Sequence, residues 1–181
     1  MLPSIATSTL IVVDIQERLL PAMHEPDQAP LLKNISILLE AFRHFGGHVL
    51  VSEQYPQGLG RTVEPLREWC DGMHTIEKTT FSMCRAADYP EHKAAIRDDV
   101  ILVGIEAHVC VLQTGCDLLL DGKRVWVPFD AVASRRPETR DNGIALLDRH
   151  GAVIINTESL LFNELGSSSS EAFKRFSRLI R

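Results

Sequence analysis

The sequence has no run of about 20 consecutive apolar residues, the length that a helix needs to cross a bilayer. It also lacks an excess of basic charge, because 19 Lys and Arg stand against 24 Asp and Glu and give a net charge of -5. We therefore expect neither a membrane nor a nucleic acid as its partner. The length of 181 residues, with 45% hydrophobic and 24% charged residues, indicates one ordinary globular domain with a sizeable core.

Cysteine is scarce, and none of the four cysteines forms a Cys-x-x-Cys pair or shows zinc-ligand spacing. They are Cys70, Cys84, Cys110 and Cys116. The seven histidines show no metal-ligand spacing either, so we expect no metal and no other cofactor. The N-terminal segment lacks a basic start and an Arg-rich transit pattern. We therefore expect a cytoplasmic protein with reduced thiols, and mitochondrial import stays open.

Five short apolar runs, rich in β-branched residues, have the composition of parallel strands that are covered on both faces. They span residues 10–13, 48–52, 100–103, 125–128 and 152–155, and a weaker sixth candidate spans 75–77. Helical spacing of apolar residues lies between them, over 31–45, 86–97, 109–120 and 137–149. This alternation predicts a doubly wound α/β fold, a three-layer α/β/α sandwich built as a single domain over 1–181.

A polar serine-rich hinge at residues 167–170 precedes a predicted C-terminal helix over 170–181. Phe173, Phe176, Leu179 and Ile180 form an apolar stripe on this helix. The stripe suits packing either on its own domain or on a partner subunit, and the sequence leaves both open.

Three reactive residues follow predicted strands and so fall on one edge of the sheet, where α/β proteins bind ligands. Asp14 ends the run LIVVD, Lys78 ends HTIEK, and Cys110 follows Gly104 at the start of a helix. A cysteine attacks as the thiolate, which an ammonium group and a helix start both favour, so Cys110 is expected to label below pH 8. A carboxylate can carry the thiol proton to the leaving group.

Each of these signals has an ordinary structural explanation. A cysteine at a helix start is commonly a core residue, an aspartate after a strand commonly a cap, and a lone lysine commonly solvated. Residue types and positions alone therefore give only a candidate trio.

Four ordered motifs extend the case to a family. TLIVVDIQERLLPAM, EKTTFSMC, ILVGIEAHVCVLQTGCDLL and VWVPFDAVASR together resemble the isochorismatase-like cysteine hydrolases over roughly residues 9–164. The resemblance implies Asp14, Lys78 and Cys110 as a catalytic triad. It also implies a six-stranded parallel sheet ordered 3-2-1-4-5-6, and a homo-oligomer, a dimer or larger. It further implies a cis peptide at Ile105-Glu106 that aims N–H groups at an oxyanion.

One segment departs from the nicotinamidase branch of that family. VSEQYPQGLGRTVEPL has no histidine where nicotinamidases carry a metal site, which argues against nicotinamidase activity. Its EQYP-x-GLG pattern is instead similar to the subgroup of isochorismatase domain-containing proteins. We expect the substrate pocket to be lined by residues near the three candidates. These are Gln16, Gln54, Tyr55, Phe81 and His108, of which Phe81 would equally suit plain core packing.

The combined reading predicts a metal-independent hydrolase of a small amide, carbamoyl or similar acyl substrate, with a covalent intermediate on Cys110. Two alternatives stay open. One is a non-catalytic binding or scaffold protein on the same fold. The other is an isochorismate-type vinyl ether hydrolase, which Cys110 disfavours because that branch commonly has another residue at this position.

Overall fold

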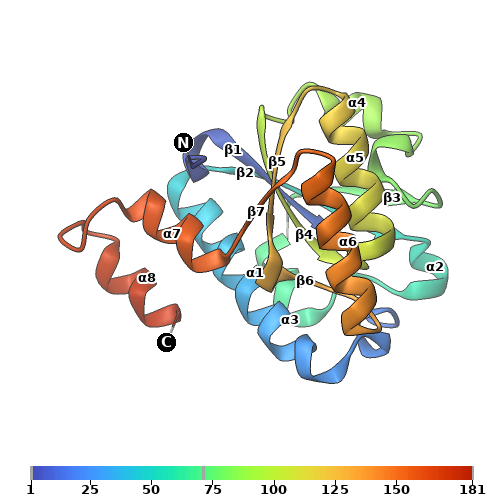
Figure 1. Ribbon diagram of the computed structural model, residues 1–181, viewed down its shortest axis with the longest axis horizontal. Helices are drawn as coiled ribbons and strands as arrows, with labels where there is room; N and C mark the ends of the chain where they lie inside the picture. The colour runs from blue at the N-terminus through green and yellow to red at the C-terminus, as the bar shows by residue number, and fades with distance from the viewer. Residues whose placement is uncertain (1, 71, 181) are drawn as a thin grey trace.

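A computed structural model describes residues 2–70 and 72–180. Its centre is a seven-stranded parallel sheet with the path β3-β2-β1-β4-β5-β7, in which β6 pairs with β4 off this path (Figure 1). The strands are β1 Ser8–Val13, β2 His48–Gln54, β3 His74–Lys78, β4 Asp99–Ile105, β5 Arg124–Pro128, β6 Val132–Ala133 and β7 Val153–Ile155. Within the described residues, no helix has the length and apolarity needed to cross a membrane.

The predicted fold class and strand order are confirmed, with one difference in strand count. The weak candidate over 75–77 is strand β3, and the predicted strand over 152–155 becomes β7, the sixth strand of the main path. The additional strand β6 has only two residues, which pair with Gly104 and Ile105 of β4. A strand this short has no periodicity that a sequence pattern can reveal.

Helices cover both faces of the sheet and make three layers (Figure 1). On one face lie α1 Glu25–Phe45, α3 Glu64–Cys70, α7 Thr157–Leu165 and α8 Phe173–Leu179. On the other face lie α4 Tyr89–Lys93, α5 Leu112–Leu120 and α6 Pro137–Arg149. The single turn α2 Pro56–Leu59 follows β2, and a π-helical turn over Ala107–Val111 leads into α5.

Strand β1 shows why the apolar runs are continuous rather than alternating. Leu10 and Val12 pack in the core beneath α1, whereas Ile11 and Val13 pack in the core beneath α5 and α6. All six residues of the strand are buried, as expected for a central parallel strand with helices on both sides.

Two predicted helices have different bounds in the structure. Helix α1 begins at Glu25 rather than at residue 31, with Pro26 in its first turn, where the missing N–H costs no helical hydrogen bond. The predicted helix over 86–97 shrinks to Tyr89–Lys93. Beyond this helix, the backbone N–H of Arg97 donates to Thr9 Oγ1 at 2.9 Å, and the Arg97 guanidinium donates to the carbonyl of Ala6 at 2.6 Å. These two hydrogen bonds hold the segment against the start of β1.

The C-terminal stripe packs on its own domain through helix α8. Phe176 is fully buried and stacks on Phe45 of α1, with ring centroids 5.4 Å apart. Arg175 forms an ion pair of 2.7 Å with Glu40, also on α1. Arg181, the last residue of the predicted helix, lies outside the described residues. A further contact of this helix with a partner subunit stays a prediction.

Candidate active site

Strands β1 and β4 bring two of the three candidate residues to one place. Val13 and Gly104 are register partners at the carboxyl ends of these strands, directly before Asp14 and Ile105. Gly104 has a φ of +119°, and a Cβ on it would lie 2.1 Å from the carbonyl oxygen of Val13. Only glycine fits this approach, so Gly104 sets the close spacing between the segment that carries Asp14 and the segment that leads to Cys110.

Asp14 is fully buried and held in a left-handed backbone conformation with a φ of 54°, which Asp tolerates better than most residues. Its N–H donates to the carbonyl of Ser52 at 3.1 Å. Its carboxylate accepts a hydrogen bond from Ser52 Oγ at 2.8 Å and one from Lys78 Nζ at 2.7 Å. Both carboxylate oxygens are therefore oriented by neighbouring strands.

Lys78 is the last residue of β3, and its side chain is completely buried. Its ammonium group donates to Asp14 Oδ2 and to Gln54 Oε1, both at 2.7 Å. The alternative of a solvated surface lysine is therefore wrong for Lys78. A buried ammonium needs such partners, because burial without compensation is very costly for a charged group.

Cys110 lies in the π-helical turn after β4 and is only 5% exposed. Burial and the negative charge of Asp14 raise the pKa of its thiol to about 12, while Lys78 acts in the opposite direction. These causes oppose the activation at rest that the sequence predicts, so slow labelling of Cys110 below pH 8 is the expected result. The physical reason is that Lys78 is paired with Asp14, so its charge does little for a desolvated thiolate.

The structure thus brings Asp14, Lys78 and Cys110 together, with Asp14 and Lys78 both facing the thiol closely enough to shift its pKa through charge and hydrogen bonding. In this arrangement the resting state is a neutral thiol beside a carboxylate. Such a pair can form the nucleophile only as the proton moves, which is general-base catalysis rather than a pre-formed thiolate.

The Ile105-Glu106 peptide bond before the π-helical turn is cis. The Glu106 side chain is almost buried, and its Oε2 accepts hydrogen bonds from the backbone N–H of Arg135 at 3.1 Å and from Arg135 Nε at 3.0 Å. The Glu106 carbonyl accepts from the N–H groups of Val109 and Val111. The turn that carries Cys110 is therefore anchored through Glu106, the residue directly before it.

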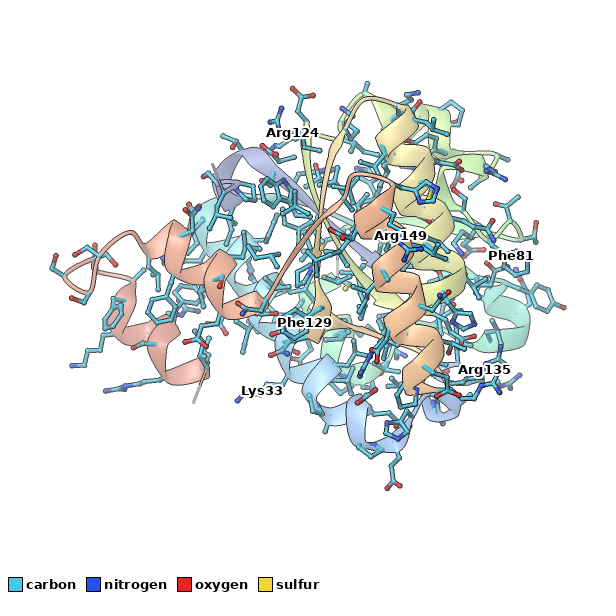
Figure 2. All side chains as sticks on the ribbon, viewed as in Figure 1. Lys33, Phe81, Arg124, Phe129, Arg135 and Arg149 are labelled. Carbon is cyan, nitrogen blue, oxygen red and sulfur yellow. The ribbon has the colours of Figure 1, made fainter. Side chains whose placement is uncertain are left out.

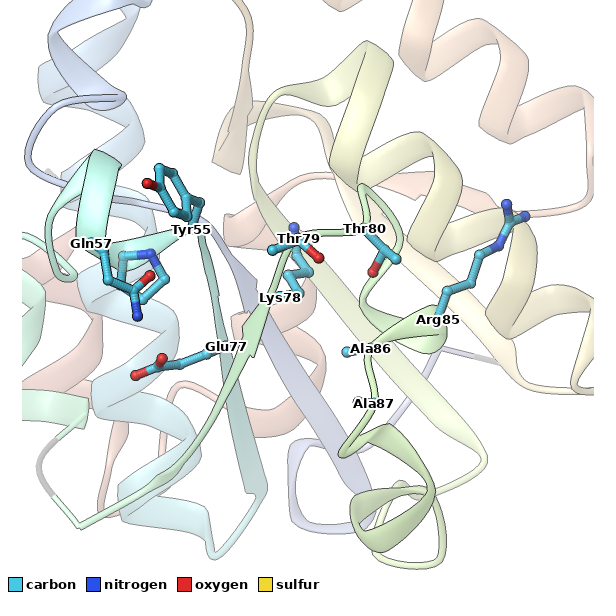
Figure 3. A pocket seen from close by; sticks show the side chains of 10 residues that line it. Tyr55, Gln57, Glu77, Lys78, Thr79, Thr80, Arg85, Ala86 and Ala87 are labelled. Carbon is cyan, nitrogen blue, oxygen red and sulfur yellow. The ribbon is translucent and has the colours of Figure 1, made fainter.

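A cavity of about 470 Å³ opens beside Lys78 (Figure 3). It is lined by Tyr55, Pro56, Gln57, Glu77, Lys78, Thr79, Thr80, Arg85, Ala86 and Ala87. Its two charged side chains besides Lys78 are already paired, since Glu77 binds Arg61 and Arg85 binds both carboxylate oxygens of Asp117. The free lining is therefore mostly hydroxyl, amide and methyl groups.

The residues predicted to line the pocket lie in different places. Tyr55 lines the cavity and is 54% exposed, whereas Gln16 is fully buried and its amide is bonded to the backbone of Gln54 and Gly60. Gln54 holds Lys78 and Thr79 rather than lining the cavity. Phe81 is 54% exposed and points outward on the same side of the molecule as Arg135 (Figure 2). Plain core packing is therefore excluded for Phe81.

Sequence reasoning missed several side chains near the site. Ser52, the register partner of Val13, orients Asp14, and a signal for it existed because a polar residue in an otherwise apolar strand needs a partner. Thr79 and Thr80 line the cavity from irregular structure, and Arg85 lines it from a short 3-10 turn, Met83–Arg85, so no periodicity marks them.

Among residues 2–70 and 72–180, no group of three or more His, Cys, Asp and Glu side chains is placed to hold a metal ion. The buried Glu53, near the end of β2, instead accepts hydrogen bonds from the N–H and Oγ1 of Thr62 and pairs with Arg61 in the loop that follows. These contacts fix the loop that carries Tyr55.

A family model, the isochorismatase domain, matches residues 8–159. This chain belongs to the isochorismatase-like hydrolase family. Isochorismatase domain-containing protein 1 of Salmo salar is 33% identical over 97% of this chain and 62% of its own length. Isochorismatase domain-containing protein 2 of Homo sapiens is 33% identical over 97% of this chain and 83% of its own length. The chain thus spans less than two thirds of the first of these relatives.

Solved structures share the same fold. One described as the MAR1 ribonuclease of Caenorhabditis elegans has a TM-score of 0.89 and 35% identity, over 99% of this chain and 92% of its own. The YcaC gene product of Escherichia coli, described as an octameric hydrolase of unknown specificity, has a TM-score of 0.87 at 17% identity, over 99% of this chain and 95% of its own. At that identity the second likeness concerns the fold alone.

Proposed function

We propose that this chain is a metal-independent cysteine hydrolase of a small amide, carbamoyl or similar acyl substrate. The observation that carries the proposal is the buried pair of Asp14 and Lys78, 2.7 Å apart, facing the thiol of Cys110 at the carboxyl edge of the sheet. A nucleophile with a base beside it, in a site whose Lys78 also lines a cavity of small-molecule size, supplies the parts that acyl transfer requires.

In the first step Cys110 Sγ attacks the substrate carbonyl carbon as its proton passes to Asp14. The carbonyl oxygen becomes an oxyanion, for which the N–H groups of Glu106 and Cys110 are the proposed donors. The carbon–nitrogen bond then breaks, and the proton on Asp14 goes to the departing amine or ammonia. Water, deprotonated by Asp14, finally attacks the thioester and releases the acid and the Cys110 thiol.

Lys78 has an electrostatic part in this scheme. Its ammonium lies 2.7 Å from Asp14 Oδ2 and provides the counter-charge that this buried side chain needs. Ser52 Oγ donates a hydrogen bond to Asp14, and Gln54 Oε1 accepts one from Lys78, so both side chains are held in position. Asp14 is therefore the proposed acceptor of the Cys110 proton.

The most direct test is release of ammonia or amine from a panel of small amides and carbamoyl compounds. We expect turnover by the native chain and a loss of at least about a thousandfold in the Cys110→Ala variant, because removing a nucleophile leaves only binding and oxyanion stabilisation. Cys116→Ala, on helix α5, is the matched control and should retain turnover. Equal turnover in the native and Cys110→Ala proteins would contradict the proposal.

Ribonuclease activity is the competing candidate, because the relative from Caenorhabditis elegans carries that description. The net charge of -5 and a nucleophile only 5% exposed favour a small substrate instead. RNA degradation that depends on Cys110 would favour the competing candidate.

We also propose that the chain forms a homo-oligomer in solution. Phe129, Val153 and Phe162 are large apolar side chains that are 50%, 44% and 40% exposed, and the related fold of Escherichia coli is described as octameric. Sedimentation velocity should show a species of at least about twice the chain mass of 20.2 kDa. A single species near 20.2 kDa would contradict this.

A further inference from the structure

A second cavity, of about 270 Å³, lies at the same edge of the sheet and has a basic lining. It is lined by His108, Arg135, Arg136 and Thr139. Two guanidinium groups and an imidazole thus face one small volume. Arg donors are well suited to planar anions such as carboxylates, which they can bind with two parallel hydrogen bonds.

Parallel pairing brings the segments that line this cavity to the same edge of the sheet as the nucleophile. Ile105 of β4 and Ala133 of β6 are register partners, so the segments that follow them emerge side by side. The first segment carries His108 and Cys110 in one π-helical turn, and the second carries Arg135 and Arg136. Helix α6 packs tightly on that turn, because a Cβ on Gly143 would lie 2.7 Å from the Ala107 carbonyl oxygen.

The contacts inside the lining orient the cations without neutralising all of them. Arg135 uses Nε for Glu106, which leaves its two terminal amino groups as further donors. Arg136 lies 3.7 Å from Glu138, and both side chains are more than 70% exposed, so this pair is weak. His108 Nδ1 is bonded to Ser134 Oγ at 3.0 Å, so the ring is held and its Nε2 points away from that contact.

The two cavities therefore differ in charge. In the cavity beside Lys78, Glu77 and Arg85 are compensated by Arg61 and Asp117. In the basic cavity, Arg135 pairs with the buried carboxylate of Glu106, whereas Arg136 makes a long and exposed contact with Glu138. Of these two cavities, the basic one offers guanidinium groups that are less fully neutralised, so a negative group of a substrate would find a counter-charge there.

We infer that the basic cavity is a subsite for a carboxylate carried by the substrate, so that the preferred substrates are acidic amides or carbamoyl compounds rather than neutral ones. The inference rests on the proposed function, since it supposes that a ligand in this cavity reaches Cys110. Arg136 and the terminal amino groups of Arg135 bind the carboxylate, and His108 closes the cavity on the side of the nucleophile.

The test compares two alkylating probes of nearly the same size, iodoacetate and iodoacetamide. With either probe the Cys110 sulfur displaces iodide and loses its proton to solvent, and peptide mapping separates Cys110 from the other three cysteines. The measured quantity is the ratio of the iodoacetate rate to the iodoacetamide rate at Cys110. We expect Arg136→Gln to lower this ratio about fivefold or more, and added salt to lower it in the native protein.

Arg149→Gln is the matched control, because it removes the same charge from the last turn of the same helix. The ratio should change less than about twofold in this variant. Malonate should slow iodoacetamide labelling of the native protein and do so less in Arg136→Gln. If iodoacetamide labels Cys110 but Arg136→Gln leaves the ratio of the iodoacetate rate to the iodoacetamide rate unchanged, the carboxylate subsite is overturned. The proposed nucleophile would then remain intact. No labelling of folded protein by either probe would overturn both.

Discussion

Replacing Asp14 by Asn is expected to have opposite effects on two properties of Cys110. Hydrolysis should fall by about a hundredfold to ten-thousandfold, because the base that accepts and returns the proton is lost. Alkylation by iodoacetamide at pH 8 should become about tenfold faster or more, because the carboxylate raises the pKa of the thiol and Lys78 would then act on the sulfur alone. The two rates are measured on the same preparation.

The control for this variant is Asp121→Asn, which removes a carboxylate near Cys84 rather than near Cys110. It should change neither rate at Cys110. The account predicts that native protein labels faster with each step in pH up to about 10 without a plateau, since the pKa of its thiol lies near 12. If Asp14→Asn instead slowed both hydrolysis and alkylation, Asp14 would be activating the thiol at rest and the account would be wrong.

Replacing Lys78 by Met is expected to destabilise the fold by about 3 to 5 kcal/mol, because it leaves the fully buried carboxylate of Asp14 without its cation. Urea unfolding followed by circular dichroism gives the free energy of unfolding. Lys93→Met is the matched control, since Lys93 pairs with Asp121 while 49% exposed. An exposed pair of this kind contributes about 0 to 1 kcal/mol.

The double variant Asp14→Asn with Lys78→Met separates loss of the pair from loss of packing. Both charges are then absent, so the double variant should be clearly more stable than the sum of the two single losses predicts. Additive losses would mean that the two side chains do not act as a buried ion pair. In that case the electrostatic explanation of the thiol pKa would also fail.

Much of this fold follows from the sequence because its central strands have no polar face. The continuous apolar runs of β1 and β4 predict parallel strands, and polar residues at their ends predict where the site lies. Asp14 follows β1 and Lys78 ends the weaker strand β3, and the structure places their charged groups 2.7 Å apart. Strand periodicity and sheet topology therefore predict which residues meet.

The sequence could not predict the ionisation state of Cys110. A helix start and a nearby lysine predict a thiolate, but burial and the charge of Asp14 outweigh them. That balance depends on desolvation and on the Asp14–Lys78 distance, which no local pattern encodes. The sequence could not predict the contacts of Gln16 either, because its amide donates to the backbone carbonyls of Gln54 and Gly60, which are 38 and 44 residues away.

The central claim is that Cys110 forms a covalent acyl intermediate, and rapid quenching with intact-mass measurement tests it most directly. The account predicts that, during turnover of a small amide, the native chain gains the mass of the acyl group. Peptide mapping should place that group on Cys110, and it should decay at the rate of acid release. Cys110→Ala should gain no mass. Product release with no adduct on Cys110, or an adduct on another residue that decays at the turnover rate, would contradict the account.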